Sequence, residues 1–146
     1  MYITLNENPF YIVKLLERRK EDLGDKYYVI LKLLPFYETY KSVNSILYLL
    51  NKNDMFETNL MKNLFAVDFE NYKEKNTPIT NLKYAHMPYG PVVNNRYDLY
   101  NFLIKNNYIE IELLDGNLGT KFKSIYECDK KLFSNDELGV LEKVKS

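Results

Sequence analysis

The chain has 146 residues, of which 46% are hydrophobic and 27% are charged, so it is long enough for one domain with a real core. Its 20 Lys and Arg residues balance its 20 Asp and Glu residues, and a formal net charge of zero argues against non-specific nucleic-acid binding, which needs surplus positive charge. The single cysteine, Cys128, excludes a disulfide framework within the chain, and no apolar run reaches the roughly 18 residues of a membrane span, so we expect a cytoplasmic protein.

The first part of the chain, residues 1–54, is predicted to be helical. A first helix is expected over residues 9–24, because Pro9 suits a first helical position and Gly24 can end a helix. The charged residues around position 18 are expected to form a solvated face of this helix. The apolar stripe that is expected to face inward consists of Ile12, Leu15, Leu16 and Leu23.

The run KYYVILKLL, residues 26–34, is too apolar to show a clear period. It is compatible with a strand, but its helical neighbours favour a buried helix. After Pro35, apolar residues recur at intervals of three and four, which predicts another helix. Its inward residues are expected to be Phe36, Tyr40, Val43, Leu47 and Leu50. The polar segment NKND, residues 51–54, is the expected internal boundary.

The segment MFETNLMKNLFAVDFENYKEKN, residues 55–76, has the clearest helical pattern. Asp68 falls on or beside its apolar face, and burying a carboxylate without partners costs several kcal/mol. We therefore expect Asp68 to lie at the rim or to be hydrogen-bonded. The apolar face is expected to consist of Phe56, Leu60, Leu64 and Val67, widened by Met61, Phe65 and Phe69.

A loop and a turn are predicted next. Thr77 precedes Pro78, which favours an extended backbone. The piece LKYAHM, residues 82–87, is expected to be extended, and PYGPVV, residues 88–93, is a turn by its Pro-x-Gly-Pro chemistry. The turn amides need acceptors, and Asp68 on the neighbouring helix can supply one, so we expect Asp68 to hydrogen-bond to the 84–92 segment.

The last third combines a helix, a hairpin and another helix. Asn94 or Asn95 can cap the first helix, and Ile109, Ile111 and Leu113 alternate with acids, which predicts a strand. DGN, residues 115–117, turns the chain into a second strand, so a hairpin is expected at about 108–127. The inward residues of the helix that follows Asn95 are expected to be Tyr97, Tyr100, Leu103 and Ile104. Ser134 and Glu137 form a capping box for the last helix. The fold class is therefore α+β, a mostly helical domain with a small antiparallel β-hairpin.

Residues with catalytic potential are scarce. His86 is the only histidine, and Cys128 lies between Glu127 and Asp129, which would raise rather than lower the pKa of a thiol. Zinc needs several His or Cys ligands, and neither a P-loop nor a dinucleotide fingerprint is present. We expect no enzyme, no catalytic residue, no cofactor and no metal, and we expect His86 to be structural.

The segment NLMKNLFAVDFENYKEKNTPITNLKYAHMPYGPV, residues 59–92, resembles the Panacea domain, the family that includes the SocA proteolytic adaptor and many antitoxins. That family combines a helix bearing an Asp-Phe pair, a Ser-Ile-Thr-Gly loop, an extended Tyr and a Tyr-Gly-Pro-Val turn. The segment DKKLFSNDELGVL, residues 129–141, is similar to the start of a late family helix. The matching signature residues are Asp68, Phe69, Thr80, Tyr84, Tyr89, Gly90, Pro91 and Val92.

The resemblance covers residues 55–146 and implies a Panacea domain there, with residues 1–54 as an added N-terminal helical region. Asn81 stands where the family has a loop Gly, and Val93 stands where the family often has Pro. Since Asn tolerates a left-handed backbone, we expect the loop to be kept. The family has more chain after the late helix, so the sequence is interpreted as truncated at its C-terminus or as a short relative.

The resemblance implies a non-enzymatic protein-binding module. Such a module is an antitoxin that neutralises a partner toxin by direct binding, or an adaptor that delivers the toxin to a protease. The alternative is a DNA-binding regulatory protein of a phage or mobile element, because a helix and a hairpin over residues 94–128 could belong to a winged helix; the zero net charge argues against it. The 14 tyrosines and many Asn and Lys residues are typical of AT-rich bacterial or phage genes.

The part of the chain that departs from the family pattern, residues 1–54, is the predicted recognition surface. One scaffold that meets many toxins needs a variable surface, and aromatic side chains supply contact area at low entropy cost. We expect four aromatic residues to be exposed there, although each could instead pack on the chain's own core. These candidate partner-binding residues are Phe10, Tyr11, Tyr37 and Tyr40.

Overall fold

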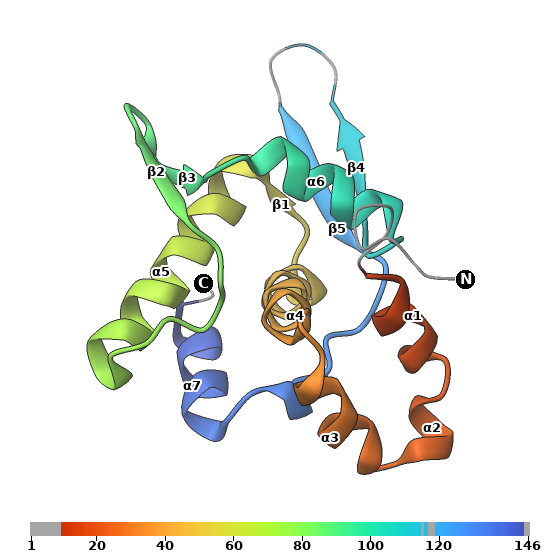
Figure 1. The fold of residues 1–146 in the computed structure, drawn as a ribbon. Coiled ribbons are helices and arrows are strands. Elements are labelled where there is room, and N and C mark those ends of the chain that lie inside the picture. The colour runs from red at the N-terminus through yellow and green to blue at the C-terminus, as the bar shows by residue number, and fades with distance from the viewer. Residues whose placement is uncertain (1–9, 115, 117–118, 145–146) are drawn as a thin grey trace. The chain divides into compact units, whose positions relative to one another are not determined.

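The computed structural model describes residues 10–114, 116 and 119–144, and the chain divides into two compact units, one ending at Tyr40 and the other beginning at Lys41 (Figure 1). The described part is mostly helical with small antiparallel sheets, so the predicted α+β class is confirmed. None of the described helices combines the length and the apolar character needed to cross a membrane.

The first unit contains three short helices, α1 (Tyr11–Glu17), α2 (Lys20–Leu23) and α3 (Lys26–Leu33), and the first turn of α4 (Tyr37–Lys52). The prediction of one helix over residues 9–24 is wrong, because a turn at Arg18 and Arg19 separates α1 from α2. Both short helices contact α3. Gly24 ends α2 with a φ of 58°, as expected for a helix terminator.

The inward face of α1 differs from the predicted stripe. Phe10 and Val13 are buried, whereas Ile12 and Leu15 are exposed. Residues 26–34 were predicted to form a buried helix. The helix is present, but most of it is not buried. Tyr27 and Leu31, one turn apart, are buried in α3, and its other apolar residues Val29, Ile30 and Leu33 are exposed.

The later turns of α4 are the centre of the second unit. Every residue from 42 to 50 is buried, including the predicted inward residues Val43, Leu47 and Leu50. Hydrogen bonds link α4 to the loop before β2, to α7 and to the segment after β5, from Ser42, Tyr48 and Asn51 respectively. Figure 1 shows α4 nearly end-on among these elements. A helix covered on all sides needs polar partners for its polar side chains, and the structure supplies them.

Helix α5 (Glu57–Lys75) forms one wall of this unit. Its buried apolar residues are Leu60, Met61, Leu64 and Val67, which confirms most of the predicted stripe. Phe56 does not belong to the helix, because it lies in strand β1 (Met55–Phe56) and pairs with Lys121. Phe69 is half exposed, so its predicted inward position is also wrong.

The predicted hairpin is present and consists of β4 (Ile109–Leu113) and β5 (Thr120–Ser124), with Ile111 opposite Phe122. Strand β1 pairs with the other edge of β5, which the sequence did not reveal, and the strand order is β1-β5-β4. The predicted DGN turn falls largely outside the described residues. Ile109 is buried and Leu113 is 80% exposed, so the far end of β4 projects beyond the core.

A second hairpin consists of β2 (Tyr84–Met87) and β3 (Gly90–Val93), and β3 packs on α5. The sequence predicted an extended piece and a turn here but not paired strands. Asn95 is the N-cap residue of α6 (Arg96–Lys105), but its side chain makes no capping hydrogen bond, so the predicted side-chain cap is wrong. Tyr100 and Leu103 are buried in α6, as expected. Tyr97 and Ile104 are exposed, so their predicted inward positions are wrong.

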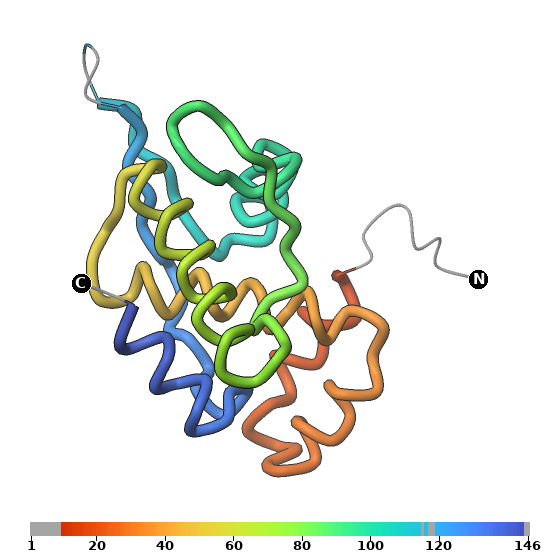
Figure 2. The backbone as a smooth tube through the Cα atoms, turned by 90° about the vertical axis from the view of Figure 1, so that its left-hand side faces the viewer, coloured from red at the N-terminus to blue at the C-terminus, as the bar shows by residue number. Residues whose placement is uncertain are grey.

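The short helix η1 (Lys130–Leu132) leads into α7 (Asn135–Val144). The predicted capping box is confirmed: the Glu137 amide donates to Ser134 Oγ at 3.1 Å, and the Ser134 amide donates to Glu137 Oε1 at 2.9 Å. Lys41 forms an ion pair of 2.7 Å with Glu137, which joins α7 to α4. Figure 2 shows α7 beside α5, which it also contacts.

Candidate partner-binding site

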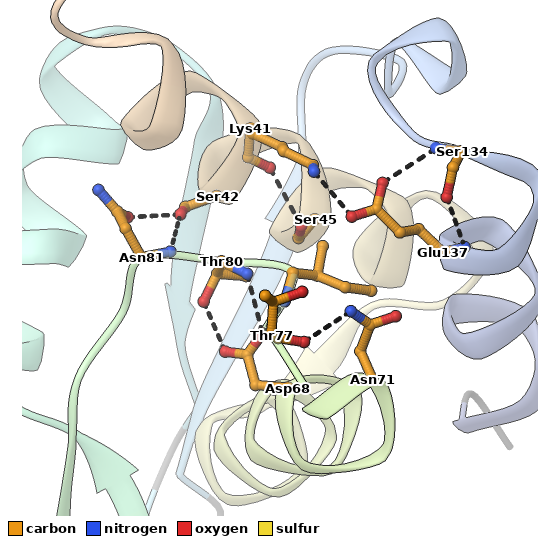
Figure 3. A network of polar contacts seen from close by, with 11 residues as sticks. Lys41, Ser42, Ser45, Asp68, Asn71, Thr77, Thr80, Asn81, Ser134 and Glu137 are labelled. Atoms are coloured by element: carbon orange, nitrogen blue, oxygen red, sulfur yellow. Dashed lines mark hydrogen bonds and ion pairs between the residues drawn. The ribbon is translucent and has the colours of Figure 1, made fainter. Parts of the chain in front are cut away.

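The signature residue Asp68 lies at the centre of a polar cluster between α5 and the loop before β2 (Figure 3). Its Oδ1 accepts hydrogen bonds from the amides of Ile79 at 3.0 Å and Thr80 at 2.9 Å. Its Oδ2 accepts from the Thr80 hydroxyl at 2.5 Å and from the Tyr84 hydroxyl at 2.7 Å. Asp68 is 6% exposed, so the hydrogen-bonded alternative of the two sequence-based expectations is correct.

Burial governs the ionisation of this cluster. Desolvation raises the pKa of the Asp68 carboxyl above its ordinary value, and hydrogen bonds from Thr80, Tyr84 and Ile79 oppose that rise. Burial, together with the negative charge of Asp68, also raises the pKa of the Tyr84 hydroxyl. Tyr84 therefore stays protonated and keeps donating its hydrogen bond to Asp68.

Two further contacts anchor the same loop, as Figure 3 shows. Asn71 Nδ2 donates to the Thr77 carbonyl at 2.8 Å, and Ser42 Oγ donates to Asn81 Oδ1 at 2.6 Å. The Asn81 amide donates back to Ser42 Oγ at 2.9 Å. The loop is thus fixed to α5 by Asp68 and Asn71 and to α4 by Ser42.

Two sequence-based expectations about this region need correction. Asp68 does hydrogen-bond to the 84–92 segment through Tyr84, as predicted, but the amides that it accepts from belong to Ile79 and Thr80 and not to the Tyr-Gly-Pro-Val turn. Asn81 is absent from the described residues with positive φ, so it does not replace the family's Gly in a left-handed conformation. Its amide side chain instead contributes a hydrogen bond that Gly cannot make.

A groove with aromatic walls adjoins the Asp68 cluster and has a volume of about 220 Å³. Phe65 packs edge-to-face on Tyr84, with ring centroids 5.3 Å apart, and stacks on Phe69 at 5.9 Å. Phe69 and Tyr72 are 50% and 55% exposed. The signature residue Phe69 therefore forms part of the surface, although Asp68, which precedes it in the sequence, is buried.

The Tyr-Gly-Pro-Val turn forms a second surface feature. Gly90 has a φ of 120°, which residues with a side chain rarely adopt, so the turn requires glycine at this position. Val92 is buried, whereas Tyr89 is 57% exposed. Tyr89, Pro91 and Val92 line a pocket of about 250 Å³ that Arg96 also lines.

The four aromatic residues predicted to be exposed in the N-terminal region differ in burial. Phe10 and Tyr40 are 1% and 4% exposed and pack together, with ring centroids 5.9 Å apart. The Tyr40 hydroxyl also lies 3.1 Å from the Tyr27 hydroxyl. Their predicted exposure is wrong, because they form the core of the first unit. Tyr11 is 44% exposed and Tyr37 is intermediate, so partner binding by these two stays a prediction.

The other residues singled out from the sequence do not cluster. His86 is an exposed residue of β2 opposite Pro91. Cys128 donates its amide to Asn51 Oδ1 at 2.7 Å. Within the described ranges, no group of three or more His, Cys, Asp or Glu side chains is arranged to hold a metal ion.

Several residues of these features carried no signal in the sequence. Ser42 and Asn71 each resemble ordinary polar residues of a helix, and their roles depend on a loop that lies 39 and 6 residues away along the chain. Arg96 is one of many basic residues, and only the paired strands before it place it beside Tyr89. A local pattern could not have found any of the three.

Comparison with known proteins identifies the second unit. The family model described as "Antitoxin SocA-like, Panacea domain" matches residues 60–146, more than half of the chain. The chain belongs to the SocA-like Panacea family. No curated protein and no solved structure matches it. All eight signature residues lie within the matched range, and so do α7 and its capping box.

The Panacea match and the compact unit begin at different residues. The match starts at Leu60, whereas the compact unit starts at Lys41 and so includes most of α4. The buried residues 42–50 supply part of the core of this unit. The predicted division of the chain at residues 54 and 55 stays a prediction.

Proposed function

We propose that this Panacea protein is an antitoxin that neutralises a partner toxin by direct binding, without enzymatic chemistry and without a cofactor. The observation that carries the proposal is the match of an antitoxin family model to residues 60–146. The expected location is the cytoplasm, where the toxin would act.

The geometry fits a binding role because the surface near Asp68 is held by the fold itself. Asp68, Asn71 and Ser42 fix the loop 77–81 through hydrogen bonds of 2.5–3.0 Å. A surface that is already ordered loses less conformational entropy when a partner binds. An ordered scaffold of this kind can therefore carry a variable recognition surface elsewhere on the chain without losing entropy of its own on binding.

The specific recognition surface is proposed to lie in the N-terminal region, residues 1–54. Within it, Tyr11 is 44% exposed and Tyr37 is partly exposed, so these two of the four candidate aromatic residues have part of their side chains at the surface. Tyrosine offers a large contact area with few rotatable bonds. Variation in this region would let one scaffold serve different toxins.

Co-expression tests the proposal. A neighbouring gene that arrests growth when expressed alone should be tolerated when this chain is co-expressed, and a pull-down should recover the two proteins as a direct complex. The proposal fails if the chain binds no neighbour-encoded protein. Retardation of operator DNA at physiological salt, without any toxin binding, would replace it with the DNA-binding alternative.

Direct neutralisation and delivery to a protease have different consequences. If binding alone neutralises the toxin, rescue should persist in cells that lack ATP-dependent proteases, and the toxin should accumulate in the complex. If the chain acts as an adaptor, rescue should require a protease and the half-life of the toxin should shorten on co-expression. A pulse-chase measurement of the toxin in both strains separates the two routes.

A further inference from the structure

The pocket beside the Tyr-Gly-Pro-Val turn combines an apolar floor with a charged rim. Its volume is about 250 Å³. Met61 and Val92 are 2% and 5% exposed and contribute its buried apolar part. Lys62, Tyr89 and Arg96 contribute polar groups from α5, the turn and α6.

The guanidinium group of Arg96 is held in place by its neighbours. Its Nη2 lies 3.4 Å from the Tyr89 hydroxyl and 3.2 Å from the Tyr97 hydroxyl. It also lies over the Tyr97 ring, 4.7 Å from the centroid. A cation that is already oriented can form a charge-assisted hydrogen bond without a further loss of side-chain entropy.

The one carboxylate in the pocket forms an ion pair with this cation but does not fill its hydrogen-bonding capacity. Glu57 Oε2 lies 3.4 Å from Arg96 Nε, but the Tyr100 hydroxyl donates to the same oxygen at 2.7 Å. Arg96 Nε is buried and makes no hydrogen bond with any of the residues that the structure describes. Glu57 is thus committed mainly to Tyr100. A carboxylate from outside cannot reach the buried Nε, but the guanidinium retains capacity for one through Nη1, which makes no hydrogen bond recorded within the described ranges.

The charge balance of the pocket is positive. Lys62 and Arg96 contribute two positive charges and Glu57 one negative charge, which leaves +1. Lys62 is exposed, and the structure records no ion pair for it within the described ranges. Tyr89 and Tyr97 are 57% and 62% exposed beside these cations. Tyr and Arg are the residue types enriched where binding energy concentrates in protein interfaces.

We propose that this pocket binds an acidic side chain of a protein partner, a Glu or Asp flanked by apolar residues. The carboxylate would lie between Arg96 and Lys62, and the apolar neighbours would contact Met61 and the ring of Tyr89. A nucleic-acid backbone fits less well, because it needs a row of cations and the pocket offers two. That the partner is a toxin rests on the proposed function, but the chemistry of the pocket does not.

Titration of the isotope-labelled full chain with two short peptides, observed by NMR, tests the pocket without any toxin. The probes are acetyl-Leu-Glu-Leu-amide and acetyl-Leu-Gln-Leu-amide, which differ in one charge. The chain has only three arginines, Arg18, Arg19 and Arg96, so the Nε–H signals are few and Arg96→Gln assigns the relevant one. The Glu peptide should shift the Arg96 signal, and the Gln peptide should bind at least about tenfold more weakly.

Charge-removing variants supply the controls. Arg96→Gln should abolish binding of the Glu peptide. Lys62→Gln removes the charge of an exposed side chain that forms no ion pair with the described residues, so the variant should fold normally and bind the Glu peptide about threefold to tenfold more weakly. Lys105→Gln makes the same charge change at the other end of α6 and should bind as the wild type does.

The proposal is overturned by equal binding of the two peptides, by shifts confined to other regions, or by no shift at millimolar peptide. It is also overturned if a short DNA duplex shifts the Arg96 signal and the Glu peptide does not. The toxin question stays separate. If the pocket binds the Glu peptide but the chain binds no neighbour-encoded protein, this proposal stands and the proposed function fails. If the chain binds a neighbour-encoded toxin but the pocket does not bind the Glu peptide, the proposed function stands and this proposal fails.

Discussion

The hydroxyl of Tyr84 on β2 donates a 2.7 Å hydrogen bond to Asp68 Oδ2 on α5. The same oxygen accepts from the Thr80 hydroxyl, while Oδ1 accepts two loop amides. One carboxyl group therefore connects a helix, a loop and the first strand of a hairpin. Three residues of the family signature, Asp68, Thr80 and Tyr84, meet at this point, which gives the signature a structural reason.

Replacing Asp68 by Ala should lower the free energy of unfolding by about 1–3 kcal/mol, because the buried amides of Ile79 and Thr80 lose their acceptor. Asp68→Asn should cost less, since the amide oxygen can still accept from both amides. Urea denaturation measures the difference. Glu74→Ala, an exposed carboxylate on the same helix, should stay within about 0.5 kcal/mol of the wild type. An Asp68→Ala protein as stable as the wild type would contradict the role given to this residue.

Asp68 should also make stability depend on pH in an unusual direction for a carboxylate. Its pKa is raised in the folded state above the ordinary 3.8, so the folded chain binds more protons than the unfolded chain between the two pKa values. The stability that the protonated Asp68 carboxyl contributes is fully present below pH 3.8, and it is lost as the pH rises through the pKa of Asp68 in the folded chain. The advantage of the wild type over Asp68→Asn should therefore shrink from about pH 4 towards neutral pH. An advantage that grows over this range would show that the hydrogen bonds outweigh burial.

Asn81 provides a test against the family's own residue. Because Asn81 does not have a positive φ, replacing it by glycine would relieve no backbone strain. Asn81→Gly should lose the 2.6 Å hydrogen bond with Ser42 and add freedom to the unfolded chain, which together should lower stability by about 1–2 kcal/mol. If the variant is instead more stable than the wild type in urea, Asn81 is a substitute for glycine and not a contributor to the loop.

Local chemistry was what the sequence predicted best. The Ser134–Glu137 capping box depends on residues three apart, and it forms as expected. The hairpin β4–β5 was visible in the alternation around Ile109 and Ile111, because one face of a strand is covered. The buried face of α5 followed its period for the same reason.

Features that depend on tertiary contacts could not be predicted. The break between α1 and α2 at Arg18 and Arg19 has no Gly or Pro to announce it. The β2–β3 hairpin was missed because Pro91, which lacks an amide donor, lies within β3 opposite His86. Pocket residue Arg96 lies 39 residues from Glu57 along the chain, and only the fold brings the two together.

His86 is expected to be dispensable for partner binding. It is exposed on β2 and is not among the residues that line the groove beside Asp68 or the pocket beside Arg96. His86→Gln should therefore leave toxin rescue and binding affinity close to those of the wild type. Growth rescue and a pull-down check this result. Loss of rescue by a folded His86→Gln protein would make the imidazole a contact or chemical residue.

The last prediction places specificity in the N-terminal region. Tyr11 is 44% exposed and Tyr72, on α5 of the Panacea domain, is 55% exposed, so the two make a matched pair of surface tyrosines in the two compact units. Tyr11→Ala should weaken toxin binding by about tenfold or more if residues 1–54 supply the recognition surface, because truncating an interface tyrosine typically costs more than 1 kcal/mol at a site of concentrated binding energy. Tyr72→Ala should then bind almost as the wild type does, and circular dichroism should confirm that both variants fold. The opposite pattern, with Tyr72→Ala impaired and Tyr11→Ala intact, would move the recognition surface to the aromatic groove beside Asp68.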